Sequence, residues 1–397
     1  MSDWMVTDLS KEMMLNIVEV LGLFFLNPLF IAALFTAVAV GYFRVKKERR
    51  NFKVRLLPGL TELKKLLAES WPYALVLSVL ISGVGLSVDP GWLVLFSAAA
   101  LVGLLSFYYK ITSPIYFTAV AFFALYFMEK YMPDFTFRGW SPGQADLLGD
   151  LAVTIPVIAG LLLIVEGQLI RRHSVRYASP FLMHTNRGLR AAAFKTKRLW
   201  LLPVVFLVPG DMITSVVPYW PQFTLGGNAF SFVPVPVIIG FSQVARTLYP
   251  DVLYPKIGRA VVWTGTAVII VGLAALWLPM LGWLSLLIGV VCRASISIKA
   301  YLGELRGGFA VAPRPAGVVV AGVVPGSPGE KMGLLPGECI RTVNGLRVSN
   351  EKELYDAIQL NAAHCRLQVI DRNGEVRLMQ QVIYRHDHHR LGLLVVR

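Results

Sequence analysis

Charged residues are scarce in this chain of 397 residues, because only 16% are Asp, Glu, Lys or Arg while 55% are hydrophobic. A soluble domain ordinarily has about a quarter of its residues charged, so the shortfall indicates a membrane protein. Acidic residues are the scarcer sign: 24 Asp and Glu stand against 38 Lys and Arg, which gives a net charge of +14. Because the basic residues flank apolar runs, their expected partners are anionic lipid headgroups, and no nucleic acid is expected.

Cysteine and histidine are also rare, and their placement argues against an enzyme. The three cysteines, Cys292, Cys339 and Cys365, lack the spacing of a metal site or a disulfide framework. None of the six histidines precedes a glutamate or lies in an apolar run, which excludes the His-Glu-x-x-His site of a membrane metalloprotease. The stretch Gly240-Phe241-Ser242-Gln243 lacks the second glycine of a rhomboid protease, and no soluble serine protease domain is present. We therefore expect no enzymatic activity and no cofactor, and we interpret His386-Asp387-His388-His389 as a polar loop rather than a metal site.

Apolar runs dominate residues 20–299, which are predicted to form a multi-span transmembrane domain. A helix needs about twenty apolar residues to cross a bilayer. About nine runs come close to that length: 21–43, 72–88, 91–109, 114–128, 151–170, 199–217, 232–245, 260–279 and 281–298. Asn27-Pro28 is expected to kink the first run, and 232–245, which is short and contains prolines, is alternatively re-entrant. Residues 1–19 are a short lead, too acidic for a secretory signal peptide.

Basic residues between the runs predict the orientation of the chain. Arg44 to Arg55 is a dense basic block, and the expected loop 171–198 carries many Lys and Arg residues without any acid. The positive-inside rule places such segments in the cytoplasm. The N-terminus is then expected outside and the C-terminal segment inside, although the span count, and with it the side of the N-terminus, is left open.

Two acidic residues within apolar runs need an explanation, because intramembrane charges are often functional. Glu166 is expected to reach the membrane surface or to pair with Arg171 or Arg172, just over one helical turn away. Asp211 follows Pro209-Gly210, and a carboxylate in a broken helix could bind an ion as transporters do. A structural role is the simpler interpretation of both. The alternative function is a membrane sensor or transporter subunit with a regulatory C-terminal domain.

Residues 317–397 form a small soluble module after the linker 300–316. The module contains Val324-Pro325-Gly326-Ser327-Pro328, then Gly333-Leu334-Leu335-Pro336-Gly337-Glu338, then Val343-Asn344-Gly345. This order resembles a bacterial PDZ domain of the permuted type. The sequence predicts a strand at 317–324, a short helix capped by Ser327, a strand at 338–343 with a hairpin turn, a helix at 350–360 capped by Ser349, and a hairpin at 365–383. The fold class is thus an α-helical polytopic membrane protein with a C-terminal α+β PDZ-like domain.

A PDZ domain binds an extended peptide as an added strand, next to a loop whose backbone N–H groups receive a terminal carboxylate. The closing segment fits the loop pattern best, since a basic residue precedes apolar residues on both sides of a glycine. The predicted groove consists of Arg390, Leu391, Gly392, Leu393, Leu394, Tyr355 and Ile358.

Two alternatives to this groove remain. The carboxylate loop could instead be Gly307, Gly308 and Phe309, which follow Arg306 and precede the first strand of the module. Otherwise, residues 391–396 are simply a closing edge strand that binds no ligand.

The whole chain resembles the MinJ family of division-site topology adaptors of Gram-positive rods. The stretch from Gly22-Leu23-Phe24-Phe25-Leu26-Asn27-Pro28 to Gly41-Tyr42-Phe43-Arg44-Val45-Lys46-Lys47-Glu48-Arg49 carries the likeness most clearly. The resemblance implies a non-enzymatic scaffold that bridges a DivIVA-like curvature-sensing protein and a MinD-like ATPase with its MinC-like inhibitor. It also implies a multi-pass plasma-membrane protein enriched at septa and poles, with a cytoplasmic C-terminal domain. Self-association is left open.

Overall fold

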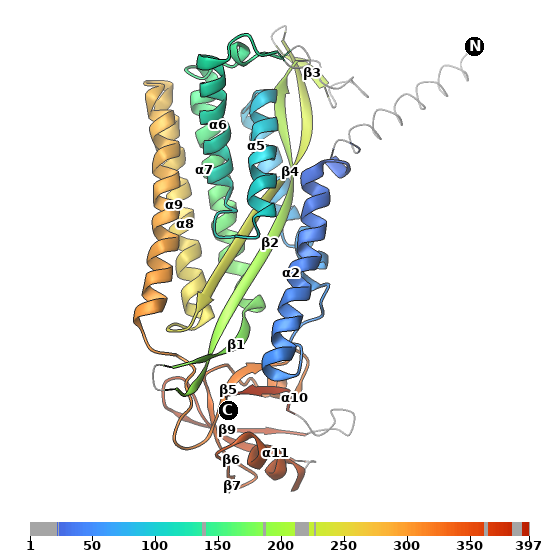
Figure 1. Cartoon of the computed structure of the whole chain (residues 1–397), viewed down its shortest axis with the longest axis vertical. Helices are drawn as coiled ribbons and strands as arrows, with labels where there is room; N and C mark the ends of the chain where they lie inside the picture. Colours follow the sequence, from blue (N-terminus) through green and yellow to red (C-terminus); the bar gives the residue numbers. More distant parts are fainter. Residues whose placement is uncertain are drawn as a thin grey trace, which may run out of the picture.

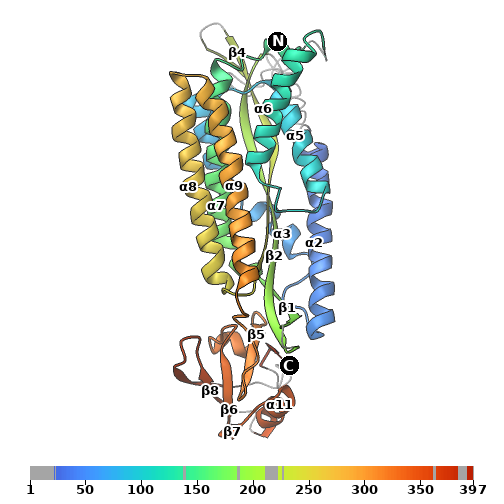
Figure 2. The ribbon, with the colours of Figure 1, turned by 60° about the vertical axis from the view of Figure 1, so that its left-hand side comes forward.

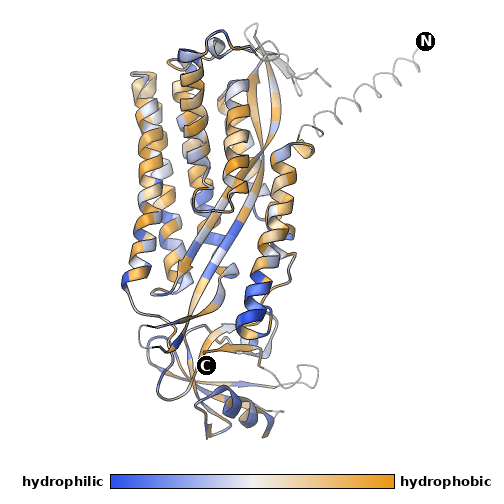
Figure 3. Cartoon of the chain, viewed as in Figure 1, coloured by the Kyte–Doolittle hydropathy of each residue, from blue (hydrophilic) through white to orange (hydrophobic). Residues whose placement is uncertain are grey.

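The computed structural model describes residues 22, 24–136, 140–185, 188–210, 222–225, 228–360, 364–382 and 391–396. Long helices and a long β-hairpin run along the molecule, and a small β-rich module lies at one end (Figure 1). Apolar residues cover the helices of the elongated part, whereas hydrophilic residues gather at the end of α2 nearest the module (Figure 3). The chain is therefore a helical membrane region followed by a C-terminal α+β domain, as the composition predicts.

Eight α-helices are described before the module, and five candidate spans are long and apolar enough to cross a membrane. The helices are α2 (Pro28–Phe52), α3 (Thr61–Ala68), α4 (Trp71–Val84), α5 (Pro90–Leu105), α6 (Pro114–Tyr131), α7 (Asp150–His173), α8 (Pro250–Leu273) and α9 (Met280–Arg306). The candidate spans are Pro28–Phe52, Thr61–Val84, Asp150–His173, Pro250–Leu276 and Met280–Arg306. Short 3₁₀ turns, η1 (Pro142–Gln144), η2 (Val175–Tyr177) and η3 (Ala274–Leu276), lie in the segments that connect the α-helices and strands.

The start of α2 differs from the kink expected at Asn27-Pro28. The Asn27 side chain accepts a hydrogen bond from the Leu29 backbone N–H at 2.9 Å, and Pro28 occupies the first helical position. This is a helix N-cap, because proline at the first turn lacks an N–H that would have no partner there anyway. The helix then continues without a break to Phe52 and ends at Lys53, which has a φ of 60°.

The helical spans expected at 199–217 and 232–245 are wrong, because these segments are strands as far as the structure describes them. A four-stranded sheet has the order β1-β2-β4-β3, with β1 at Ser179–His184, β2 at Arg190–Pro209, β3 at Gln222–Leu225 and β4 at Asn228–Ala245. A continuous apolar run cannot by itself distinguish a buried strand from a buried helix. Here the β-branched residues and the prolines of Val204-Val205-Phe206-Leu207-Val208 and Phe232-Val233-Pro234-Val235-Pro236 favour extended backbone.

The register of β2 and β4 accommodates the prolines of both strands. Pro203 lies opposite Pro236, and Val205 lies opposite Pro234. The Val205 N–H points away from β4 and donates to the Ser78 hydroxyl at 2.9 Å. Because residues of one parity share one direction in an antiparallel ladder, these prolines stand at positions where no ladder N–H is needed.

Backbone groups on the outer edges of the hairpin are satisfied by the surrounding helices and loops. The Leu201 carbonyl accepts from the Ser70 hydroxyl at 2.5 Å, and the Leu207 carbonyl accepts from the Val88 N–H at 2.8 Å. On β4, the Gly240 N–H donates to the Thr112 carbonyl at 2.6 Å. An apolar surrounding tolerates non-helical backbone only when protein buries it and completes its hydrogen bonds, which is the arrangement here.

The expected basic loop 171–198 is mostly strand and is partly buried. Arg198 is fully buried and its Nη2 donates to the Glu69 carboxylate at 2.6 Å. The Trp200 indole N–H donates to the same carboxylate at 3.0 Å, and the Tyr177 hydroxyl donates to its other oxygen. The sequence misled here because the acid that neutralises Arg198 lies more than a hundred residues away in the chain.

Helices α7 and α8 cross at glycines that let their backbones touch. A Cβ on Gly160 would lie 2.7 Å from the Gly265 carbonyl oxygen, and a Cβ on Gly167 would lie 2.6 Å from the Gly258 carbonyl oxygen. The relation is reciprocal, since Gly265 and Gly258 meet the carbonyls of Gly160 and Gly167 at the same distances. Small residues at such contacts are the means by which helices associate closely in lipid.

Glu166 pairs with Arg293 of α9, not with the nearby Arg171 or Arg172. Both residues are buried, and Nε and Nη2 of Arg293 lie 2.9 Å and 2.7 Å from one Glu166 oxygen. The other oxygen accepts from the hydroxyl of Ser113, the residue before α6. This ion pair therefore joins three helices, and Glu166 has a structural role.

We predict that Glu166→Ala destabilises the purified full chain in detergent by about 3–5 kcal/mol, because it leaves the Arg293 guanidinium buried without a counter-charge. The double variant Glu166→Leu/Arg293→Met should recover most of that loss, since an apolar pair removes both charges. Thermal unfolding measures both effects. The control is Arg172→Ala on the exposed end of α7, which should change stability by about 0.5 kcal/mol at most. Equal losses in Glu166→Ala and Arg172→Ala would contradict the assigned pair.

Candidate functional site

The module follows α9 through the segment 307–317 and contains a six-stranded sheet. Its main path has the order β10-β5-β6-β8-β9, and β7 pairs with β6. Its elements are β5 (Val318–Val323), α10 (Pro328–Lys331), β6 (Cys339–Val343), β7 (Leu346–Arg347), α11 (Glu351–Leu360), β8 (Cys365–Ile370), β9 (Val376–Gln381) and β10 (Leu393–Val395). Figure 2 shows α11 along one side of the β5, β6 and β8 strands. The strands and helices predicted for 317–383 are confirmed where they are described.

Local sequence explains the two helices of the module, with one correction. Ser327 accepts from the Glu330 N–H and Pro328 follows it, so Ser327 caps α10 as predicted. The cap of α11, however, is Asn350 and not Ser349. The Asn350 side chain accepts from the Glu353 N–H at 2.9 Å, while the Glu353 carboxylate accepts from the Ser349 N–H at 2.7 Å. The Asn-x-x-Glu spacing in the sequence is the local signal for this cap.

The hairpin turn after β6 also positions α11. Asn344 and Gly345 have φ values of 52° and 86°, as a two-residue turn of this type requires. The Asn344 side-chain amide donates to the Ala357 carbonyl of α11 at 3.1 Å, and its oxygen accepts from the Arg366 N–H at 2.9 Å. Asn344 thus fixes the helix against β8 as well as reversing the chain.

The closing segment forms the strand beside β5 that the permuted arrangement predicts. Leu393 pairs with Val323, Leu394 with Gly322 and Val395 with Val320, all antiparallel. Gly392, which has a φ of 71°, accepts from the Val324 N–H at 2.8 Å through its carbonyl. The Leu391 carbonyl accepts from the Gly329 N–H of α10 at 2.9 Å, so the loop before β10 is held at both residues.

One edge of β10 has no strand partner among the described strands, because β10 ends the sheet. Gly392 and Val396 direct their bonds to β5, since the Val396 N–H donates to the Val319 carbonyl at 3.0 Å. Residues of the other parity, Leu393 and Val395, therefore direct N–H and C=O toward the open edge. An extended peptide can add to such an edge through backbone hydrogen bonds.

The side chains of the predicted groove divide between three places. Leu391, Leu393 and Ile358 lie in the apolar core of the module, and Leu391 and Ile358 are fully buried there. Tyr355 packs half-buried at the margin of that core, one position after the buried Leu354 on α11. Tyr355 is thus the half-buried residue of this set on α11. Arg390 lies outside the described residues.

Leu394 faces away from the module core. It belongs, with Val396, Val319 and Ala321, to the apolar core that the module shares with the membrane region. Gly322 of the same face approaches Pro180 of β1, at 3.1 Å from where its Cβ would be. The sheet formed by β5 and β10 therefore has one face in each core, and Leu394 belongs to the docking face rather than to the groove.

A second contact fixes the module to the membrane region. Arg372, in the turn after β8, donates to the Asp251 carboxylate at 2.6 Å and lies 3.9 Å from the Tyr249 ring centroid. Its Nε also donates to the Pro336 carbonyl at 2.9 Å. The sequence could not predict this contact from a local pattern, because Arg372 and Asp251 lie 121 residues apart in the chain.

The alternative carboxylate loop lies at the end of α9. Gly307 approaches Thr247, and its carbonyl accepts from Arg246 at 3.2 Å. The Arg246 guanidinium also lies 5.2 Å from the Phe309 ring centroid. These contacts tie the segment to the loop before α8. Eight residues separate Phe309 from β5, so Gly307, Gly308 and Phe309 lie in the connection between the two domains.

Two buried cysteines of the module allow its opening to be measured by thiol modification. Cys339 and Cys365 are both buried, at the starts of β6 and β8. Burial raises the pKa of the Cys365 thiol to about 11 and also raises the pKa of Cys339, against a lowering by Arg314 and Arg341. Thiols in such surroundings react slowly until the module opens.

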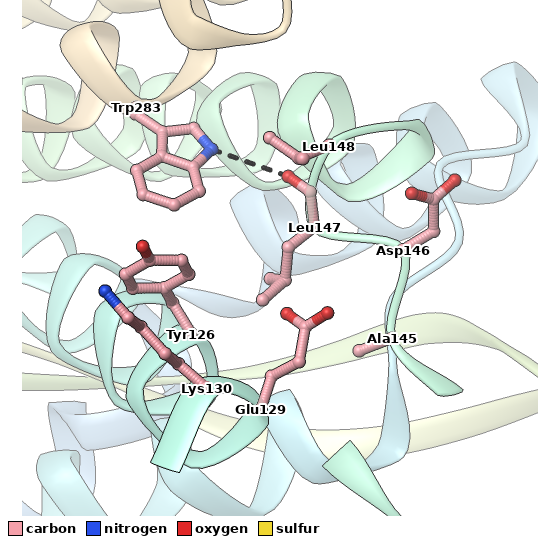
Figure 4. A pocket seen from close by; sticks show the side chains of 8 residues that line it. All are labelled: Tyr126, Glu129, Lys130, Ala145, Asp146, Leu147, Leu148 and Trp283. Carbon is pink, nitrogen blue, oxygen red and sulfur yellow. Dashed lines mark hydrogen bonds between the residues drawn. The ribbon is translucent and has the colours of Figure 1, made fainter. Parts of the chain in front are cut away.

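A separate cavity of about 380 Å³ is lined by the end of α6, by residues 145–148 before α7 and by Trp283 near the start of α9 (Figure 4). The Trp283 indole donates to the Leu147 carbonyl at 3.4 Å, and the Trp283 and Tyr126 rings meet at 4.6 Å between centroids. Its charged groups are two carboxylates, Glu129 and Asp146, and the ammonium of Lys130. Within the described part of the chain, no group of three or more metal-ligating side chains is found here or elsewhere. Asp211 and the histidines at 386–389 lie outside the described residues.

Comparison with known proteins connects this architecture to cell division. Residues 319–371 match the family model of a PDZ domain, a range that ends before β9 and β10. The chain is 31% identical over 390 residues to "Cell division topological determinant MinJ" of Bacillus subtilis, covering 98% of this chain and 97% of that protein. It is 29% identical over 264 residues to "Probable cell division topological determinant MinJ" of Lacticaseibacillus paracasei, covering 64% of this chain and 68% of that protein.

We predict that Gly392→Ala opens the module more than Gly374→Ala does. Both glycines have positive φ, but a Cβ on Gly392 would lie 2.3 Å from the Ser327 Cβ, whereas a Cβ on Gly374 meets open space. Overpacking of this kind costs about 1–3 kcal/mol, which corresponds to a rise in the open fraction of roughly fivefold to 150-fold. The rate of thiol modification at pH 8, in a Cys292→Ser background, measures the opening. Equal rates in the two variants would show that the loop at Gly392 does not hold the module together.

Proposed function

Because this chain belongs to the MinJ family of cell-division topological determinants, we propose that it is a non-enzymatic membrane scaffold in division-site selection. The scaffold bridges a polar, DivIVA-like curvature-sensing protein and a MinD-like ATPase with its MinC-like inhibitor. The PDZ domain serves as its protein-binding module.

The observation that carries the proposal is identity at 31% along 98% of the chain. A PDZ domain alone occurs in proteins of many kinds, but here the membrane region, with its buried hairpin, is part of the same alignment. The sheet of the module supports the proposal, because β10 ends it and offers the open edge that a strand-adding peptide requires.

The distribution of basic residues supports a cytoplasmic module. Arg49, Arg50 and Lys53 lie at the end of α2, and Arg171 and Arg172 lie at the end of α7. Both helix ends point toward the module in Figure 1. By the positive-inside rule that end faces the cytoplasm, so the partners of the module are cytoplasmic and its nearby basic residues face anionic lipid.

A transporter or sensor finds less support in the described residues. The case for it rested on unexplained intramembrane acids, and Glu166 is now accounted for by Arg293 and Ser113. Its carboxylate joins three helices and is engaged on both oxygens. A buried carboxylate whose two oxygens both accept hydrogen bonds from the protein stabilises helix packing and has no free oxygen for an ion.

A fluorescent fusion of the full chain should concentrate at septa and poles of a rod-shaped Gram-positive host that lacks its own family member. The scaffold should also restore septum placement, since it would recruit the division inhibitor away from midcell. The control is Asp211→Asn, which a transport path would not tolerate and a scaffold should. Fluorescence microscopy measures both. Uniform membrane fluorescence of the unchanged chain would contradict the proposal.

Recovery of division proteins from membranes should fall about tenfold or more in Tyr355→Ala, because truncating an aromatic anchor of an interface costs about 2 kcal/mol. The matched control is Asp356→Ala, one residue along α11 on its exposed side, which should recover partners as the unchanged chain does. Quantitative immunoblots of DivIVA-like and MinD-like proteins provide the measurement. Unchanged recovery in Tyr355→Ala would remove the groove assignment while leaving the scaffold proposal to the localisation experiment.

A further inference from the structure

Three lysines face one small cavity between α2 and the β1–β2 strands. Lys47 of α2 and Lys195 and Lys197 of β2 line a space of about 140 Å³, and each of them is half-buried. The Lys47 ammonium lies 3.5 Å from the Phe181 ring centroid, and the Lys197 ammonium is 3.4 Å from the Phe107 carbonyl. Within the described part of the chain, none of the three lysines has a carboxylate within ion-pair distance.

The other basic residue of this cavity, Arg44, already has carboxylate partners, so those two carboxylates neutralise Arg44 and not the lysines. Arg44 contacts Glu62 at 2.6 Å and Glu48 at 2.9 Å. Lys195, by contrast, lies close enough to repel Lys47, Lys197 and Lys110. Like charges that are half-buried together favour an anion between them.

An apolar groove begins where the lysine cavity ends. A second cavity, of about 550 Å³, lies between α2 and the end of α5 and shares Phe107 with the first. Its lining is Pro28, Ile31, Ala32, Phe35, Thr36, Ala39, Leu105 and Phe107. From Pro28 to Ala39 the helix advances roughly 16 Å at 1.5 Å per residue, about half the thickness of a hydrocarbon core.

The residue common to both cavities has an unusual backbone. Phe107 has a φ of 54°, and its side chain is 43% exposed. A bulky residue adopts positive φ only when its surroundings impose it. Here the Phe107 carbonyl accepts from the Lys197 ammonium, and the residue lines both spaces.

We propose that the two cavities together bind one anionic phospholipid, with its phosphate among Lys47, Lys195 and Lys197 and one acyl chain along α2. The charge of the lysines selects an anionic headgroup, and the adjoining apolar groove selects a ligand with a hydrocarbon tail. The proposal is independent of the partner proteins and of the groove at β10. Basic residues in general attract anionic membranes, whereas this site would hold one lipid between defined side chains.

The test measures lipid retained by the full chain in detergent, by native mass spectrometry, with phosphatidylglycerol and phosphatidylcholine as probes. Phosphatidylglycerol should bind the unchanged chain in preference. Lys195→Gln/Lys197→Gln should weaken that binding about tenfold or more, because each lysine near a phosphate contributes substantially to anionic lipid affinity. The matched control, Arg171→Gln/Arg172→Gln, removes the same charge from exposed arginines at the end of α7 that line neither cavity, and should stay within about twofold.

A second variant tests the acyl chain without changing charge. Ala39→Trp places an indole in the apolar groove and should also reduce retained phosphatidylglycerol, while leaving the lysines intact. Glycerol 3-phosphate, which carries the phosphate without a tail, should compete poorly. Equal loss in the lysine and arginine variants, equal retention of phosphatidylcholine, or full competition by glycerol 3-phosphate would each overturn the proposal. Unfolding temperatures in the absence of lipid establish that each variant is folded.

Discussion

The backbone of the β2–β4 hairpin has to find a hydrogen-bond partner for each polar group inside an apolar bundle, and much of the structure follows from that requirement. The two strands satisfy each other on their inner edges. On their outer edges Ser70 and Ser78 from the α3–α4 region, Val88 before α5 and Thr112 before α6 provide the partners. Ser70, Val88 and Thr112 stand next to helix starts, whereas Ser78 lies within α4. The short helices α4, α5 and α6 are therefore positioned by the edges they serve, whereas α7, α8 and α9 pack as long helices.

The strand β1 and two sets of charged side chains connect the membrane region to the module. β1 pairs with the start of β2 and also lies against Gly322 of β5, so the hairpin in the bundle and the sheet of the module meet at one strand. Glu48 reinforces the junction, since it accepts from the Ser179 hydroxyl at 2.8 Å and from Arg44 at 2.9 Å. Arg372 with Asp251 and Tyr249 provides a separate contact. A peptide added to β10 would thus be held at a fixed position relative to the bundle.

Local signals in the sequence predicted the module well and the bundle partly. Ser327-Pro328 and Asn344-Gly345 each depend on a few neighbouring residues, and each has the predicted conformation. Apolar runs located seven of the expected spans within helices, but the runs at 199–217 and 232–245 hold strands. Hydropathy measures burial and not backbone shape, so β-branched residues and prolines were the only local warning. The partners of Glu166 and Arg198 were beyond prediction, because each ion pair joins residues more than a hundred positions apart. Leu394 was assigned to the groove because of its place in the loop motif. Successive side chains of a strand point to opposite faces, so Leu394 faces the membrane region while Leu393 faces the module core.

The pairing of β10 with β5 has a consequence for how the protein is made. A ribosome delivers β5 first and β10 after every other described strand of the module, so β5 waits with one edge open throughout synthesis of the intervening residues. The same strand contributes Val319 and Ala321 to the core shared with the bundle. Docking against β1 can therefore shield one face of β5 early, while its edge stays available to other extended chains. A nascent chain halted before residue 391 would therefore leave one edge of β5 without its strand partner, while β6 still pairs with the other edge.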